Sequence, residues 1–156
     1  MDVPANLRSQ WISQTQLILA SYRRLLGRDL LTRGGDPEDE AKRLFAAPFV
    51  ALSHGTEADP LLNYANRAAL ELWQMAPETL VATPSRLTAE PMERDKRQRF
   101  LEQTAQHGFL TGYEGIRISA AGTRFVIHDA TIWNLADDAG QLAGQAATFA
   151  KWSFLR

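Results

Sequence analysis

Three histidines are the residues of this chain best suited to acid–base or metal chemistry, and their spacing fits neither. They are His54, His107 and His128. No two stand four positions apart on one helix face, and the HExxH sequence of zinc enzymes is absent. His107 closes an expected helix, where the helix dipole alone favours a cation. We therefore interpret all three as structural residues.

Other catalytic signatures are also missing. The chain has no cysteine, which excludes disulfides, thiolate nucleophiles and iron–sulfur clusters. No GxSxG, P-loop or GxGxxG sequence occurs. Asp129 follows His128 within an expected strand, but neighbours in a strand point to opposite faces, so they cannot form an acid–base pair without a bulge. The sequence therefore predicts a protein that is not an enzyme.

Arg86 is a candidate for binding, because it lies in an otherwise apolar helical segment. A guanidinium that points inward must be paired, since an isolated buried charge is too costly. Its forked donors suit a ligand carboxylate or phosphate. The alternative, which we favour, is a structural salt bridge to Glu90, four residues further on.

Aromatic residues at strand spacing could line a cavity, which usually has apolar walls and a few polar groups that orient the ligand. Five fit this description: Tyr64, Trp73, Tyr113, Phe125 and Trp133. Such residues are more often plain core. Asn63 and Asn134, within apolar strands, could orient a ligand or bond the backbone near a strand end.

Two helices open the chain. Apolar residues recur at helical spacing on the first: Leu7, Trp11, Ile18, Tyr22, Leu25 and Leu26. This pattern predicts a helix over residues 6–31, capped by Asn6 and stopped at Gly34. Asp36 as a cap and Pro37 at the first helical position predict a second, shorter helix.

The pattern then changes to strand spacing. Expected strands cover residues 49–54, 61–65, 113–119, 124–135 and 144–155. Helices are expected between the second and third strands, over 67–73, in short turns over 76–90, and over 91–107. Hairpin connections predict an antiparallel sheet. The middle helices can cover one face, and the first helix can cover the other, either from the same chain or from a second copy.

Alternation assigns side chains to faces. We expect Ile116 and Ile118 on one face of their strand and Arg117 on the other, and we expect Trp133 on the same face as Phe125. The mixed charges of residues 93–99 indicate a solvated helix face.

Bulk properties exclude several partners. The 156 residues suit one compact unit, and the formal net charge of -1 gives no support for nucleic-acid binding. No apolar run approaches the roughly 18 residues of a membrane span, and the N-terminus does not resemble a signal peptide. We expect a cytoplasmic location.

Several segments carry a family resemblance. They are the Leu62–Trp73 segment (LNYANRAALELW), the Pro84–Met92 segment (PSRLTAEPM), Gly108-Phe109, the Gly115–Ser119 segment (GIRIS) and the Gly144–Phe149 segment (GQAATF). Over roughly residues 12–155 the chain resembles the MEKHLA domain family, whose PAS-related members occur as small bacterial proteins and in plant homeodomain-zipper transcription factors. The resemblance implies an α+β fold with a five-stranded antiparallel sheet in the order 2-1-5-4-3. A helical bracket would cover one face, and an N-terminal extension (residues 1–47) would cap the domain of residues 48–156.

The resemblance also implies a sensory or regulatory module that binds a small organic ligand or a protein partner, forms a homodimer through the N-terminal helix, and acts on an unknown downstream protein. In light-sensing PAS relatives a glutamine at the position of Gln145 contacts flavin. Cysteinyl adduct chemistry is excluded here, and non-covalent flavin or haem, the latter near His107, is not favoured. The predicted ligand contacts are Asn63, Tyr64, Trp73, Arg86, Ile116, Ile118, Trp133 and Gln145.

Two alternatives remain open. One is a small cone-shaped enzyme resembling ketosteroid isomerase, with His128 or Asp129 in an apolar pocket. The other is a pure protein-interaction domain with a filled core.

Overall fold

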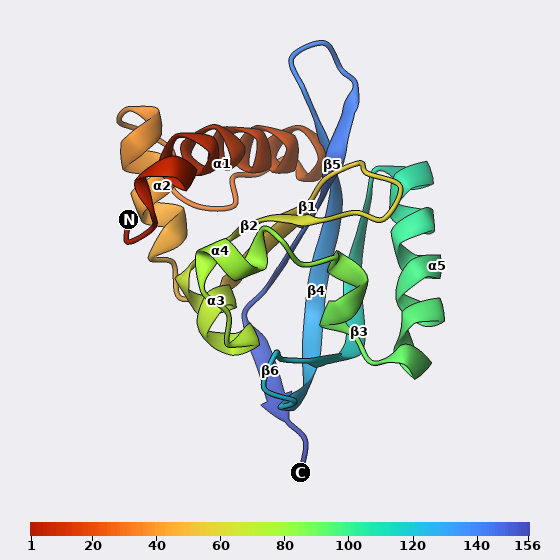
Figure 1. The fold of residues 1–156 in the computed structure, drawn as a ribbon. Coiled ribbons are helices and arrows are strands. Elements are labelled where there is room, and N and C mark those ends of the chain that lie inside the picture. Colours follow the sequence, from red (N-terminus) through yellow and green to blue (C-terminus); the bar gives the residue numbers. More distant parts are fainter.

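One antiparallel sheet organises the structure, a computed structural model that describes residues 1–156 (Figure 1). Its strands are β1 (Val50–His54), β2 (Leu62–Ala65), β3 (Phe109–Ile118), β4 (Arg124–Ala136), β5 (Leu142–Phe149) and β6 (Lys151–Phe154). The order is β2-β1-β5-β4-β3, and β6 pairs with the first half of β4. The predicted order 2-1-5-4-3 is confirmed. The predicted last strand appears as two, β5 and β6, on either side of Ala150.

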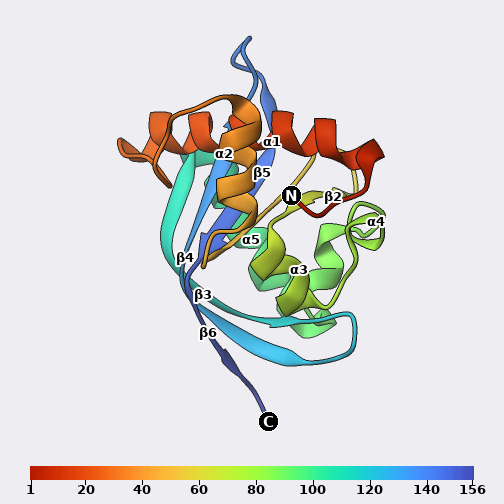
Figure 2. The same cartoon turned by 90° about the vertical axis from the view of Figure 1, so that its left-hand side faces the viewer.

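Helices cover both faces of this sheet. The inner face packs against α3 (Arg67–Trp73), the short 3-10 helix η1 (Ser85–Thr88) and α5 (Pro91–His107), with α4 (Pro77–Leu80) beside β2. The outer face is partly covered by α1 (Ala5–Leu26), and α2 (Pro37–Phe45) packs against α1 (Figure 2). None of these helices has both the length and the apolar character that crossing a bilayer requires.

The apolar stripe of α1 is buried on its own sheet. Trp11 packs on Tyr64 of β2 with ring centroids 5.1 Å apart, and Tyr22 meets Trp133 of β4 edge-on at 5.0 Å. Aromatic pairs favour such tilted and edge-on arrangements. The first helix therefore covers the sheet of the same chain, which was one of the two predicted alternatives.

The predicted ends of α1 are wrong. The helix ends at Leu26, because Gly27 adopts a left-handed conformation with φ 75° and its N–H bonds to the carbonyl of Arg23. Asn6 lies inside the helix, which Pro4 precedes without a side-chain cap.

Asn66 joins three elements, which exceeds its predicted role as a cap. Its side-chain oxygen accepts the N–H of Ala69, capping α3, and also the N–H of Ala51 in β1. Its amide nitrogen donates to the carbonyls of Leu44 and Phe49. One buried side chain therefore connects the end of α2, the start of β1 and the start of α3.

A bulge in β4 decides which side chains face inward. His128 and Asp129 together stand opposite Glu114, because Tyr113 pairs with Ala130 while Gly115 pairs with Ile127. Asp129 has φ 53°, as the extra residue of a bulge can. Alternation therefore reverses here: Phe125 and Ile127 point inward, but so do Ala130 and Ile132 instead of Trp133. The prediction that Trp133 shares the face of Phe125 is wrong for this reason.

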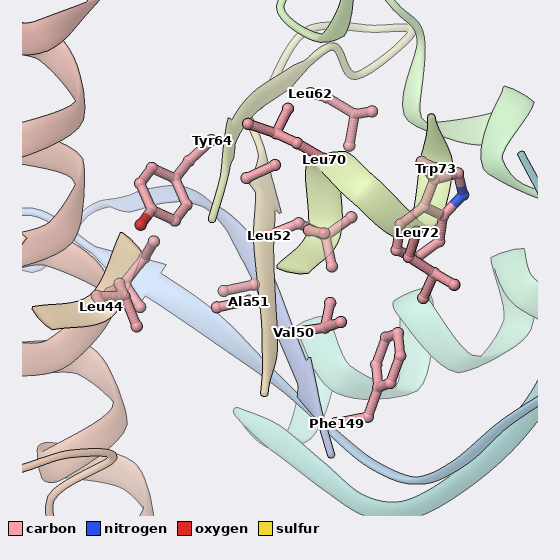
Figure 3. Close-up of a cluster of buried hydrophobic side chains, with 14 of the residues drawn as sticks. Leu44, Val50, Ala51, Leu52, Leu62, Tyr64, Leu70, Leu72, Trp73 and Phe149 are labelled. Carbon is pink, nitrogen blue, oxygen red and sulfur yellow. The ribbon is translucent and has the colours of Figure 1, made fainter. Parts of the chain in front are cut away.

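The core has two parts, one on each face of the sheet. In Figure 3, Tyr64 and Leu44 lie on the side of β1 that faces α1 and α2, whereas Trp73 and Phe149 lie together on the opposite side. The Trp73 ring contacts Phe149 at 6.1 Å and Phe125 at 5.1 Å between centroids. The part of the core on the inner face of the sheet does not fill all the space between the sheet and α5.

Candidate ligand-binding cavity

A cavity of about 60 Å³ lies between the inner face of the sheet and the segment from α3 to α5. Strands β1, β2, β3, β4 and β5 form one wall, and α3, η1 and α5 form the other. The lining residues are Leu52, Ser53, His54, Leu62, Trp73, Ser85, Thr88, Arg97, Leu101, Tyr113, Arg117, Ile127, Ala130, Ile132, Gln145, Ala146, Ala147 and Phe149. At roughly 10–15 Å³ per water-sized group, this space holds about four to six such groups.

A groove of about 360 Å³ lies next to the cavity, between the β1–β2 loop and α5. The cavity and the groove share five lining residues: His54, Ser85, Arg97, Leu101 and Gln145. These five side chains lie between the two spaces. The cavity and the groove therefore adjoin at these residues.

Two arginines enter the cavity wall from opposite sides. Arg97 of α5 is 8% exposed and donates one hydrogen bond, at 2.7 Å, to the hydroxyl of Ser85. Arg117 of β3 is 7% exposed and donates to the Tyr113 hydroxyl at 2.9 Å and to the carbonyl of Ile116 at 2.8 Å. Its guanidinium also lies over the Tyr113 ring, 5.3 Å from the centroid. Each arginine retains donors without a protein acceptor.

Neither buried arginine has an acidic partner. The five arginines that form ion pairs are more exposed, with 30–49% of each side chain accessible: Arg8, Arg33, Arg43, Arg86 and Arg124. No aspartate or glutamate lines the inner cavity, although Glu57, Asp59 and Glu102 line the outer groove. Burial, and next the charge of Arg117, lower the pKa of Arg97 to about 10, so it stays charged at neutral pH. The cavity therefore holds two uncompensated positive charges.

Gly115 makes room for this arrangement. It lies between Tyr113 and Arg117 on the same face of β3. A Cβ at this position would lie 2.6 Å from the Tyr113 hydroxyl oxygen and 3.1 Å from a terminal nitrogen of Arg117. The absence of a side chain therefore lets the tyrosine and the arginine meet.

His54 adds a hydrogen-bond acceptor. Its Nδ1 lies 3.0 Å from the carbonyl of Gly55, which can only accept, so Nδ1 carries the proton and Nε2 has a free lone pair. Burial, together with the charge of Arg97, lowers the pKa of His54, which favours the neutral ring. Nε2 is buried and has no protein partner.

Two of the eight predicted ligand contacts line the cavity, Trp73 and Gln145. The Gln145 amide nitrogen donates to the carbonyl of Leu101 at 2.9 Å and to Asn134 at 3.1 Å, so it also joins α5 to the sheet. Arg86 lies outside, in the groove, where it pairs with Asp59 at 3.2 Å. The predicted Arg86–Glu90 bridge is wrong, because Glu90 pairs with Arg124.

The other five predicted contacts lie on the outer face of the sheet. Tyr64 and Trp133 pack under α1, and Asn63 bonds Ser53 beside Gln14 of the same helix. Ile116 and Ile118 are half-buried opposite Val126 and Arg124, on the face away from the cavity. The cavity is formed without these residues.

The sequence reading missed Arg97 and Arg117. Arg97 was assigned to a solvated helix face, but it is buried against η1 and the sheet. For β3 the alternation was correct, but Ile116 and Ile118 were assigned to the cavity instead of Arg117. The row Tyr113, Gly115, Arg117, with a glycine between two large side chains, is the signal that could have revealed this face.

The same geometry does not fit a metal ion or a large cofactor. No group of three His, Asp or Glu side chains could hold a metal ion. The cavity is far smaller than the roughly 300 Å³ or more of pockets that enclose drug-sized ligands. In this conformation it does not fit a flavin ring or a haem.

A second constellation lies on the outer face. His128 Nδ1 is 2.8 Å from Glu114, and its Nε2 is 3.0 Å from the Ser153 hydroxyl, the connectivity of a serine–histidine–carboxylate triad. Glu114 is 66% exposed and none of the three lines the cavity or the groove, so the site does not exclude water as such catalysis requires. Asp129 is exposed as well, so neither predicted enzymatic residue faces the cavity.

The fold and cavity define a PAS-like α+β domain, and comparisons with known proteins agree. A PAS domain from Colwellia psychrerythraea superposes with a TM-score of 0.62 at 13% identity, covering 76% of this chain and 95% of that one. The PAS domain of a LuxR-family transcriptional regulator from Burkholderia thailandensis, in complex with ethanol, gives a TM-score of 0.53 at 18% identity, covering 73% and 95%.

The family follows from the sequence match. Residues 12–154 match the MEKHLA domain model, so the chain belongs to the MEKHLA domain family. It is 27% identical over 149 residues to the homeobox-leucine zipper protein ATHB-9 of Arabidopsis thaliana. That match covers 94% of this chain and 17% of the plant protein.

Proposed function

We propose that this chain is a non-catalytic sensory or regulatory module that binds a small organic ligand in the cavity between its sheet and α5. The observation that carries the proposal is the cavity itself, which adjoins a surface groove at Arg97 and His54. A purely structural core would close such a space, because interiors are packed to near crystal density. The ethanol complex of the Burkholderia PAS domain supports small-ligand binding in this fold.

The proposed output is a change in how the sheet and the N-terminal extension contact a downstream protein. Residues 1–47 would act as the cap and dimerisation extension of the domain formed by residues 48–156. Because the apolar stripe of α1 is occupied by its own sheet, a homodimer contact through α1 would use the polar outer side of this helix. Sedimentation of the purified chain with and without ligand tests this arrangement.

The ligand-binding proposal is tested by native mass spectrometry and a UV–visible spectrum of freshly purified protein, repeated on Ala130→Leu. Ala130 lines the cavity and is fully buried, so leucine would fill the space. We expect a bound small molecule, or a thermal shift with added small molecules, in the wild type and its loss in Ala130→Leu. Ala139→Leu, in the exposed turn after β4, is the matched control. Equal behaviour of wild type and Ala130→Leu would contradict the proposal.

A further inference from the structure

We infer that the ligand of the cavity is a small organic carboxylate, held by Arg97 and Arg117 with its organic part against the apolar wall. Because the cavity must first bind a ligand, this inference rests on the proposed function. It deepens that function by assigning the chemical class of the ligand and the residues that select it.

The positive charges of the two arginines indicate that the ligand is negatively charged. Arg97 and Arg117 are buried residues, 8% and 7% exposed, and no carboxylate of the protein lines the cavity. A buried charge without a partner is strongly unfavourable, so protein interiors pair such groups. Five of the more exposed arginines have carboxylate partners, whereas the two buried ones have only hydroxyls, a carbonyl and an aromatic ring. An anion that enters the cavity would supply the missing countercharge.

The fixed donors determine the shape of the ligand. The Ser85 hydroxyl holds one terminal nitrogen of Arg97, and the Tyr113 hydroxyl and the Ile116 carbonyl hold Arg117. Both forks are therefore oriented before a ligand arrives. A planar fork of N–H donors matches the two oxygens of a carboxylate. Arg97 and Arg117 both line this one small cavity, so a single anion inside it lies beside both residues, and the charge of Arg117 also lowers the pKa of Arg97.

The remaining wall distinguishes an organic from an inorganic anion. Leu52, Ile127, Ile132 and Phe149 line the cavity and offer no hydrogen bonds, so they suit an alkyl group. Space for about four to six water-sized groups matches acetate, glycolate or lactate. The free Nε2 of His54 can accept a hydrogen bond from a ligand hydroxyl, which glycolate and lactate carry.

The test measures binding of sodium acetate, glycolate and lactate by titration calorimetry at constant ionic strength, against the neutral analogue acetamide and inorganic phosphate. We expect one-to-one binding of the carboxylates and none of acetamide. Arg97→Met and Arg117→Met should each weaken carboxylate binding roughly 10- to 100-fold, as the loss of a charge-assisted hydrogen-bonded pair does. Arg8→Met, which removes an exposed arginine paired with Glu38, should bind as the wild type does.

The possible results separate the inference from the function on which it rests. If acetamide binds as tightly as acetate, or if both cavity variants keep wild-type affinity, the carboxylate inference is overturned while the binding function stands. Binding of phosphate alone would overturn the organic class. If none of the carboxylates, acetamide or phosphate binds, and if Ala130→Leu behaves as the wild type does in mass spectrometry and thermal unfolding, both proposals fail. The acetate–acetamide comparison uses only the wild type, so the test holds even if a variant does not fold.

Discussion

Replacing Arg97 with methionine should stabilise the ligand-free protein while weakening its ligand binding. Methionine keeps the length of the aliphatic chain but carries no charge. If the guanidinium is held for an anion, the folded protein without that anion carries an unfavourable buried charge. If the guanidinium instead braces η1 through Ser85, its removal should destabilise the fold. The two roles therefore predict opposite signs.

The structure gives the size of this effect. Burial, with a further contribution from Arg117, lowers the pKa of Arg97 to about 10. A lowering of about 2.5 from the ordinary arginine pKa corresponds to about 3–4 kcal/mol, at about 1.4 kcal/mol for each tenfold change in the acidity constant. The sign is unfavourable at any pH below about 10, because the folded state binds this proton less tightly than the unfolded state does. Losing the Ser85 hydrogen bond costs about 1–2 kcal/mol. The net gain is about 1–3 kcal/mol, or roughly 2–12 °C in Tm.

The assay is thermal unfolding followed by circular dichroism at pH 7, in a buffer free of carboxylates. Arg8→Met is the control, because Arg8 is an exposed arginine, for which we expect a change within about 0.5–1 kcal/mol. Adding glycolate should raise the Tm of the wild type but not that of Arg97→Met. A Tm of Arg97→Met below that of the wild type would show that the guanidinium is a structural brace and would refute the reasoning.

Three further predictions concern other residues. Gly115→Ala should destabilise the protein by about 1–3 kcal/mol in urea unfolding and weaken carboxylate binding, because the new methyl group displaces Tyr113 from Arg117; unchanged binding would contradict this. Asn66→Ala should cost at least about 3 kcal/mol in the same assay, since several buried backbone groups lose their partner, and a loss under about 1 kcal/mol would contradict its joining role. The pKa of His54 is lowered in the folded protein, so the stability that the neutral ring contributes is fully present above pH 6.5 and is lost as pH falls through the folded pKa. The Tm of the wild type should therefore drop between pH 6.5 and 5 more than that of His54→Gln. Parallel plots of Tm against pH for the two proteins would contradict this prediction.

Much of the fold could be predicted because its signals are local. Asp36 followed by Pro37 predicted α2, and the structure shows the full capping box with Asp39. Helix α5 begins at Pro91 and ends before Gly108, as expected. The first helix was predicted too long because its apolar pattern continues past Gly27, and spacing alone does not show which glycine turns left-handed.

The candidate site was harder to predict because it depends on which face of the sheet each side chain occupies, and that depends on the register in which the strands pair. One extra residue at His128–Asp129 reverses the alternation along β4, which moves Trp133 to the outer face and Ala130 to the cavity. A bulge of this kind has no strong local sequence signal, since it depends on how two strands pair. The burial of Arg97 depends similarly on where α5 lies against the sheet.

The sequence by itself determined the element order and the antiparallel pairing, because caps, hairpin turns and apolar periodicity act over a few neighbouring residues, and the likeness of its segments to the MEKHLA domain determined the family. Only the tertiary structure decided that α1 covers its own sheet, that Arg97 and Arg117 line the same cavity, and that no carboxylate lines it. Those facts depend on contacts between residues far apart in the chain. Their energies come from burial and from the pairing of charges, which exist only once the sheet and the helices have packed together.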